Sequence, residues 1–265
     1  MIIDGRALAE RIYQDLEARF AEERPALGIL LAAGDAATES FVRIKTRAAQ
    51  RLFIPLERID LPERATTEEA IAAVAALARR CMGVVVQLPL PQALDTDAVL
   101  AAIPRERDAD ALNPQVPERE RVAMAPVARA VLAILDDAGV VPGGKRAVVI
   151  GDGRLVGAPC SAALRAAGAA VEVVTLEQGS LASLASADIV VAGAGSPGLI
   201  TPAMLMPGCV LIDAGTSESG GKVVGDADPR CADVASVFTP VPGGVGPVAV
   251  AMLFANLADL ARRAL

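Results

Sequence analysis

The sequence predicts an α/β protein of two domains, each built on a mostly parallel sheet. Apolar, strand-like runs alternate with helical segments along the chain, which is typical of parallel strands joined by helices. A stretch with four prolines and many charges, residues 104–126, divides this alternation into two halves. At 265 residues the chain is long enough to bury a sizeable core in two medium-sized domains.

The first half predicts a three-layer α/β domain, with helices on both faces of a mostly parallel sheet. Its third helix carries the clearest start signal, because Thr66 or Thr67 can cap it and Glu68 and Glu69 occupy its first turn. The predicted helices are 7–23, 38–51, 67–81 and 95–102, and the predicted strands are 27–32, 56–60 and 84–87.

The second half predicts a Rossmann-like domain. A helix over 127–138 ends at Gly139, and a strand over 147–150 then leads into the glycine-rich turn 151–157 and another helix. Because the glycine spacing is G-x-G-x-x-x-G rather than G-x-G-x-x-G, this signal alone is weak. Further strands are predicted at 171–175, 189–192 and 210–213, and an amphipathic helix at 248–265.

Composition excludes several classes of partner. The net charge of −7 argues against binding to nucleic acid or to an anionic membrane. The N-terminal residues lack an apolar signal core, and no uninterrupted apolar run reaches membrane length. We therefore expect a cytoplasmic protein.

The chain contains no histidine, which limits its chemistry. Ser-His-Asp and Cys-His catalysis and His-ligated metals are excluded, so a general acid or base must be Lys, Asp, Glu, Tyr or Cys, and no metal site is predicted. The cysteines are widely spaced without a C-x-x-C pair, so we expect small buried side chains in a reducing compartment. They are Cys81, Cys160, Cys209 and Cys231.

Two loop segments are the most informative parts of the sequence. Residues 239–247 (TPVPGGVGP) hold three glycines and three prolines, so we expect neither helix nor strand there but a stiff loop that contacts a ligand. Residues 83–91 (GVVVQLPLP) read as a buried parallel strand that ends in Gln87. A polar amide at the carboxyl end of such a strand lies where open α/β sheets bind ligands.

Together these two segments resemble the methylenetetrahydrofolate dehydrogenase/cyclohydrolase family, which carries V-Q-L-P-L-P after a central strand and T-P-V-P-G-G-V-G-P before its last helix. Order, spacing and chain length also agree, so the resemblance covers nearly the whole chain. It implies a folate-binding catalytic domain at 1–125 and 248–265, and a Rossmann-like NAD(P)-binding domain at 126–247. It further implies that the last helix packs on the first domain and that the protein is a homodimer.

Lys45 is the catalytic residue that the resemblance implies. It lies in residues 37–45, where the family has S-x-x-Y-V-x-x-K, and it shares a helix face with Phe41. The ring of Phe41 would stack on a pterin, and Lys45 would place a proton donor at its one-carbon bridge; the family's tyrosine hydroxyl is absent here. From the residues alone, a core phenylalanine and a lysine on a solvated face remain the alternative.

Gln87 and Asp110 complete the implied catalytic set. In the family this glutamine bonds the lysine and tunes its protonation, and the alternative is a glutamine that caps a turn. Residues 107–111 (RDADA) resemble the family's K-D-V-D-G, whose second aspartate grips the pterin's amidine edge with two hydrogen bonds. The alternative for Asp110 is a charged linker turn. Pro242, Gly243 and Gly244 would also hold the pterin.

The glycine-rich turn implies NAD more than NADP as the cofactor. Gly151-Asp152-Gly153 stands where the family has G-R-S, and Asp152 would repel the 2′-phosphate of NADP. Glu177, twenty residues after Gly157, suits the free 2′-hydroxyl of NAD. Gly193 and Thr216 follow later strands and could face the cofactor. The alternative is a Rossmann-like domain that binds no dinucleotide.

The expected function is one-carbon folate metabolism: NAD(P)-dependent oxidation of methylenetetrahydrofolate to methenyltetrahydrofolate, and its hydrolysis to formyltetrahydrofolate. One alternative is a divergent member that keeps the folate cleft but has lost or altered one or both activities. It is motivated by departures from the family pattern at Phe41 and at 111–113, 124–125, 152–153 and 248–249. A second alternative is a non-enzymatic pterin-binding protein, although such a protein has no need of Lys45.

Overall fold

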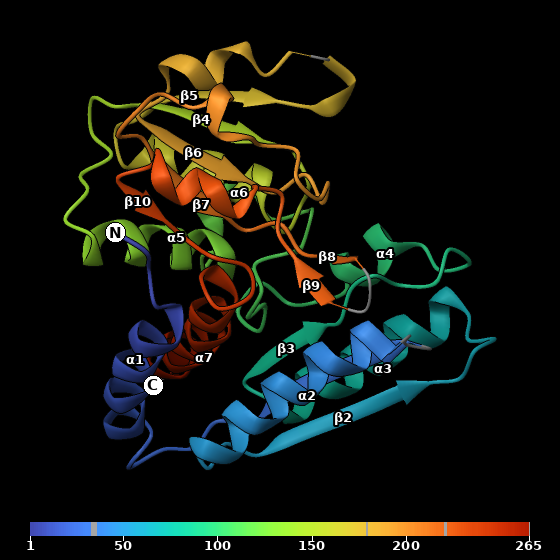
Figure 1. The fold of residues 1–265 in the computed structure, drawn as a ribbon. Helices are drawn as coiled ribbons and strands as arrows, with labels where there is room; N and C mark the ends of the chain where they lie inside the picture. The colour runs from blue at the N-terminus through green and yellow to red at the C-terminus, as the bar shows by residue number, and fades with distance from the viewer. Residues whose placement is uncertain (33–35, 179, 220–221, 265) are drawn as a thin grey trace. The chain divides into compact units, whose positions relative to one another are not determined.

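The computed structural model describes residues 1–32, 36–178, 180–219 and 222–264. The chain divides into two compact units (Figure 1). The small-sheet unit comprises Ile12–Pro126 and Val250–Leu265, and the large-sheet unit comprises Met1–Arg11 and Val127–Ala249. The predicted α/β class with parallel sheets is confirmed in both units.

The small-sheet unit contains three parallel strands in the order β2-β1-β3. They span Leu27–Ala32 (β1), Leu56–Leu61 (β2) and Gly83–Val86 (β3). The central strand β1 and β3 are buried along their whole length, as expected for parallel strands covered on both faces. The sequence predicted all three strands to within one residue at either end.

Helices cover both faces of this sheet, so the three-layer prediction is confirmed (Figure 1). On one face Leu30 and Val86 pack against Val74 and Leu77 of α3. On the other face a Cβ at Gly83 would meet Leu257 of the last helix, which therefore packs on this sheet. The helices that contribute to this unit are α1 (Gly5–Arg19), α2 (Ala36–Arg51), α3 (Thr67–Arg80), α4 (Thr96–Ala101) and α7 (Val245–Ala264).

The segment predicted as a linker, 104–126, is ordered along the small sheet. Asp108 forms a parallel bridge with Val84 of β3, because the Val84 N–H donates to the Arg107 carbonyl at 2.7 Å. Apart from the 3-10 helix η1 (Glu118–Glu120), residues 104–125 contain no helix. It is held to the last helix by Asn256, whose side-chain amide donates to the carbonyls of Ala109 and Met124.

The large-sheet unit is a five-stranded parallel sheet in the order β10-β7-β6-β4-β5. Because the chain leaves β4 toward β5 on one side and β6 on the other, the strand order reverses at β4, as in dinucleotide-binding folds. The strands are β4 (Arg146–Ile150), β5 (Ala170–Val174), β6 (Ile189–Ala192), β7 (Val210–Asp213) and β10 (Val237–Phe238). α5 (Pro126–Asp137) precedes β4 in the chain, and the later connections contain α6 (Gly157–Ala166) and the 3-10 helices η2 (Leu176–Gln178), η3 (Ala182–Ser186), η4 (Pro202–Met204) and η5 (Pro229–Asp233).

The N-terminal residues belong to the large-sheet unit. Ile2 bridges Phe238 in parallel, since the Ile3 N–H donates to the Phe238 carbonyl and the Phe238 N–H to the Met1 carbonyl, both at 2.9 Å. The contact division therefore differs from the predicted domain ranges over Met1–Arg11. This pairing joins segments far apart in the sequence, which no local pattern reveals.

Three further features differ from the prediction. The last helix begins at Val245 instead of residue 248. The N–H groups in the first turn of a helix have no partner within the helix, so a proline such as Pro247 is tolerated there, as is Gly246. The first helix begins at Gly5, where Asp4 accepts the N–H groups of Arg6 and Ala7 at 3.0 Å. The antiparallel hairpin of β8 (Ser217–Ser219) and β9 (Lys222–Val224), and the short strand β10, were not predicted.

Among the described residues, α7 is the one helix whose length and composition would allow it to cross a membrane. Its most apolar window is 67% buried inside the structure. Leu253, Phe254 and Leu257 are almost completely covered, so its apolar character is that of a core helix.

Candidate active site

Lys45 and Gln87 meet above the small sheet. Lys45 lies on α2, and Gln87 follows the last residue of β3. The Lys45 Nζ donates to the Gln87 Oε1 at 2.7 Å. The Gln87 amide nitrogen donates to the Leu88 carbonyl at 2.7 Å, which fixes the amide so that its oxygen faces the lysine. The alternative of a lysine on a solvated helix face is therefore wrong.

Asp110 is a charged neighbour that acts on Lys45. Burial lowers the pKa of Lys45, and the carboxylate of Asp110 opposes that shift. Burial also raises the pKa of Asp110 to about 6, with Lys45 acting to lower it and Asp108 to raise it. The structure thus brings together all three predicted catalytic residues, which are widely separated in the sequence. Both charged groups are poised nearer to neutral pH than in water, which suits proton transfer.

Asp110 lies in a tight turn that begins at Asp108, the residue that bridges Val84 of β3. Asp108 is buried, and its Oδ2 accepts the N–H of Asn113 at 2.8 Å. Within the turn Ala111 adopts a φ of 56°, in the left-handed region that disfavours residues with a Cβ. Asn113 completes the turn by donating to the Ile103 carbonyl at 2.7 Å. Sequence reasoning noted the departure from the family's G-F-H at 111–113 but missed this structural role.

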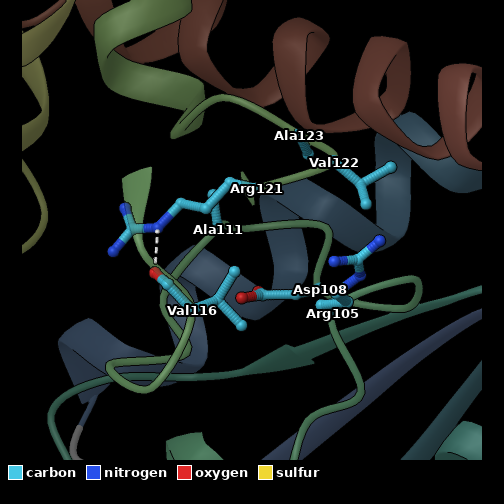
Figure 2. A pocket seen from close by; sticks show the side chains of 7 residues that line it. All are labelled: Arg105, Asp108, Ala111, Val116, Arg121, Val122 and Ala123. Atoms are coloured by element: carbon cyan, nitrogen blue, oxygen red, sulfur yellow. Dashed lines mark hydrogen bonds between the residues drawn. The ribbon is translucent and has the colours of Figure 1, made fainter. Parts of the chain in front are cut away.

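The carboxylate of Asp108 points among side chains that line a small surface hollow (Figure 2). Its Oδ1 has no hydrogen-bond partner within the described part of the chain. Burial raises the pKa of this carboxyl, and Arg121 opposes the shift. Figure 2 also shows that Arg121 donates to the Val116 carbonyl, at 3.3 Å, instead of reaching Asp108.

Phe41 lies one helical turn before Lys45 on α2, and its side chain is 44% exposed. A ring that contributed only to the core would be covered, so the alternative of a core phenylalanine is wrong. An exposed ring one turn from a half-buried lysine can stack on a flat ligand.

The predicted substrate loop lies in the large-sheet unit. Gly243 has a φ of 112°, and the Gly244 N–H donates to the Pro240 carbonyl at 2.7 Å, which closes the turn. A Cβ at Gly5 would overlap the carbonyl oxygen of Gly244, so the start of α1 packs directly against this loop. Pro242 is exposed at the tip. The peptide bonds preceding Pro89 and Pro242 are both cis.

The glycine-rich turn after β4 has the shape of a dinucleotide site. A Cβ at Gly151 would lie 2.7 Å from the Gly193 carbonyl oxygen, and one at Gly157 would overlap the backbone of Gly151. At Gly153 a Cβ would meet nothing within 4 Å, so a ligand can approach the backbone there. The N-cap of α6, Val156, makes no side-chain cap. These features fit a pyrophosphate at the helix N-terminus.

Other residues predicted for the cofactor lie at the same edge of this sheet. Asp152 is exposed in the turn after β4, and Glu177 is exposed in η2 just beyond β5. Since β4 and β5 are paired parallel neighbours, both acids follow carboxyl ends of adjacent strands. Gly193 follows β6, and Thr216 is exposed after β7.

Sequence reasoning missed several buried polar side chains, among them Asn256, Asp213 and Asp226. Asn256 sits in an otherwise apolar run of the last helix, and that interruption was the available signal. No comparable pattern distinguishes the two aspartates from solvated ones. In the described residues, no three His, Cys, Asp or Glu side chains form a group that could hold a metal ion.

Comparison with known proteins gives two family matches that together span most of the chain. Residues 3–110 match the catalytic domain of the tetrahydrofolate dehydrogenase/cyclohydrolase family. Residues 125–265 match the NAD(P)-binding domain of the same family. The bifunctional protein FolD of Methanospirillum hungatei is 37% identical over 273 residues, covering 99% of this chain and 98% of the relative.

Solved structures agree in fold over the full chain. The bifunctional methylenetetrahydrofolate dehydrogenase/cyclohydrolase from Campylobacter jejuni superposes with a TM-score of 0.93 at 29% identity, covering 100% of this chain and 99% of the other. The corresponding enzyme from Trypanosoma brucei, complexed with NADP and an inhibitor, gives a TM-score of 0.90 at 35% identity, covering 100% and 98%.

Proposed function

The chain belongs to the tetrahydrofolate dehydrogenase/cyclohydrolase family, and we propose that it oxidises methylenetetrahydrofolate with NAD(P)⁺ and then hydrolyses the methenyl product to formyltetrahydrofolate. The observation that carries this proposal is the hydrogen bond of 2.7 Å between Lys45 and Gln87, with Asp110 as the neighbouring charge. The comparisons give no support to the alternative of a divergent member that has lost or altered an activity.

Lys45 is proposed to manage the protons of the hydrolysis. Water adds to the methenyl carbon, the bond from this carbon to one ring-side nitrogen breaks, and one proton is released overall. A neutral amine can accept the proton of the attacking water and return it to the departing nitrogen. Burial favours the neutral form of Lys45, and the Gln87 oxygen holds its Nζ in place without adding a charge.

The remaining site residues are proposed to hold the substrate. Asp110 would accept two hydrogen bonds from the pterin's amidine edge, and Phe41 would stack on the ring. Pro242, Gly243 and Gly244 would form a further contact through their backbone, which glycine leaves accessible. Oxidation needs no side chain as a reactant; the bound dinucleotide supplies the two-electron oxidant.

NAD is the proposed cofactor in preference to NADP. Gly151, Gly153 and Gly157 would hold the pyrophosphate, with Gly193 and Thr216 beside it. The exposed carboxylates of Asp152 and Glu177 would flank the adenine ribose, where they would favour a 2′-hydroxyl over a 2′-phosphate. Initial rates of nicotinamide reduction with both cofactors test this. Faster turnover with NADP would contradict the preference and leave the enzyme assignment standing.

Lys45→Ala tests the mechanism. We expect methenyltetrahydrofolate hydrolysis to fall by about 10²–10⁴-fold, the usual contribution of a general acid or base. Arg47→Ala is the matched control, because Arg47 is exposed two residues further along the same helix. Its rate should stay within about twofold of the unsubstituted protein. Hydrolysis by Lys45→Ala within tenfold of that rate would remove Lys45 from the mechanism.

A homodimer and a cytoplasmic location are also proposed, the first from the family resemblance and the second from composition. Light scattering in solution tests the dimer. A native mass equal to that of one chain at micromolar concentration would contradict it.

A further inference from the structure

Two carboxylates are buried beneath the carboxyl edge of the large sheet. Asp213, the last residue of β7, is 1% exposed, and Asp226, just after β9, is 0% exposed. A buried carboxylate destabilises a fold unless hydrogen bonds from the protein replace those it made to water. The groups that donate these hydrogen bonds therefore indicate the role of the carboxylate.

Asp226 accepts three successive backbone N–H groups of the loop that follows β6. Its Oδ2 accepts from Ala194 at 2.7 Å and from Gly195 at 3.2 Å, and its Oδ1 accepts from Ser196 at 2.7 Å. Three converging N–H groups of this kind form a nest that binds anions. Here the nest binds the Asp226 carboxylate of the protein itself. The carboxylate therefore fixes the conformation of the loop, and the three N–H groups are not available to a ligand.

Asp213 in turn holds the backbone that carries Asp226. Its Oδ1 accepts from Gly215 at 3.0 Å and from Asp226 at 3.1 Å, and its Oδ2 accepts from Ala227 at 2.8 Å. Burial raises the pKa of Asp213 to about 6, and these N–H groups oppose the shift. We call the two carboxylates and their N–H donors the aspartate clamp.

The clamp leaves no room for side chains around it. A Cβ at Gly215 would overlap the Asp226 carboxylate, and one at Gly225 would overlap the Asp213 carboxylate. Only glycine at 215 and 225 lets the backbone approach the two carboxylates this closely. The loops after β6 and β7 are therefore fixed to each other through these two residues.

The clamped loop also abuts the glycine-rich turn. A Cβ at Gly193 would overlap the side chain of Val156, the N-cap of α6, and the Gly193 carbonyl lies against Gly151. A shift of the loop after β6 would therefore displace the turn that is proposed to receive the pyrophosphate. β4 and β6 flank the point at which the strand order reverses, where this fold binds its ligands.

We infer that Asp213 and Asp226 are positioning residues for the dinucleotide site: the aspartate clamp holds the loop 193–196 in the shape that NAD(P) binds. This inference rests on the proposed function of the large-sheet unit. It assigns no contact with the cofactor to either carboxylate; both act through the backbone that they hold.

Asp226→Asn tests the inference, because the amide keeps the size of the carboxylate but turns one acceptor into a donor facing an N–H. We expect the Kd of NADH, measured by calorimetry, and the KM of the oxidised cofactor to rise at least about tenfold. A rise of this size corresponds to the loss of one charge-assisted hydrogen bond. Hydrolysis of methenyltetrahydrofolate, which consumes no dinucleotide, should change by less than about threefold, which separates positioning from a general loss of structure.

Asp228→Asn is the matched control. Asp228 lies two residues further on, and its carboxylate caps η5 and pairs with Arg230 at the surface instead of holding the loop. Its NADH affinity should equal that of the unsubstituted protein. A Kd for Asp226→Asn within twofold of this control would overturn the inference.

Amide hydrogen exchange tests the clamp without any substitution. In the protein without cofactor, the N–H groups of Ala194, Gly195 and Ser196 should exchange as slowly as those of β6. Exchange as fast as in exposed loops would overturn the inference even if Asp226→Asn does not fold. Slow exchange in a protein that binds neither dinucleotide would instead contradict the proposed function, and with it the role assigned to the clamp.

Discussion

At the scale of single residues, the protonation of Lys45 depends on what faces it. Its Nζ meets a neutral amide oxygen at 2.7 Å, and Asp110, the charged group that acts on it, has a pKa raised to about 6 by burial. A carboxylate in place of the amide would hold the proton on the amine. The choice of glutamine therefore keeps the lysine able to exchange protons.

Gln87→Glu should raise the pKa of Lys45 and move the pH midpoint of hydrolysis upward by about 1–3 units. The shift is upward because the neutral amine of Lys45 is the base. Activity appears as the pH rises through the pKa of Lys45, and the added carboxylate raises that pKa. Gln87→Met, which removes the hydrogen bond without adding charge, should move the midpoint downward or leave it. A pH–rate profile of each variant measures these midpoints. Equal midpoints for both variants would contradict the role of Gln87 in tuning the pKa of Lys45.

At the scale of elements, the segment 104–126 shows how a turn can depend on one backbone conformation. Ala111 has a φ of 56° in the turn that places Asp110, and its side chain is buried. A left-handed alanine costs about 1–2 kcal/mol relative to its usual conformation. Three contacts hold the turn in place: the Asp108 carboxylate, the Asn113 amide and the Asn256 amide.

Ala111→Gly should leave the free energy of unfolding unchanged or raise it by up to about 1 kcal/mol, because the relief of strain offsets the lost methyl group and the more flexible unfolded chain. Ala102→Gly is the control, since Ala102 caps α4 at a φ of −75° that alanine adopts freely. It should lose about 0.5–1 kcal/mol. Urea unfolding of both variants measures the difference, and equal losses would contradict strain at Ala111.

At the scale of the whole molecule, contacts between distant parts of the sequence complete each unit. The N-terminal residues pair with β10 and pack under the loop 239–247, and the last helix covers one face of the small sheet. Both ends of the chain therefore support segments proposed to bind substrate.

Gly5→Ala should lower the free energy of unfolding by about 1–3 kcal/mol, because the new Cβ would overlap the Gly244 carbonyl oxygen. Alanine is locally the better residue in a helix, so a loss can only come from this packing. The KM for the folate substrate should rise as the loop moves. In the control Gly143→Ala the Cβ would lie 3.6 Å from its nearest neighbour, the Ala167 carbonyl oxygen, and stability should stay within about 0.5 kcal/mol. Equal stability of both variants would contradict the close packing.

The sequence by itself predicted most elements, because strand and helix patterns are local. β1, β6 and β7 have the predicted bounds, and Thr66 caps α3 with Glu69 in a reciprocal pair, as its start signal indicated. It also predicted Lys45, Gln87 and Asp110, through segments that resemble a family. The hairpin β8–β9 and strand β10 escaped because such short segments have too few residues for a periodic pattern.

Only the tertiary structure decided which polar side chains are buried and what they hold. Asp213 and Asp226 look like ordinary surface acids in the sequence, yet each accepts three backbone N–H groups from segments up to 32 residues away. The same holds for the pairing of Met1–Ile3 with Phe238. The physical reason is that burial and hydrogen-bond partners depend on how segments pack in space, whereas sequence patterns report only the conformation of neighbouring residues.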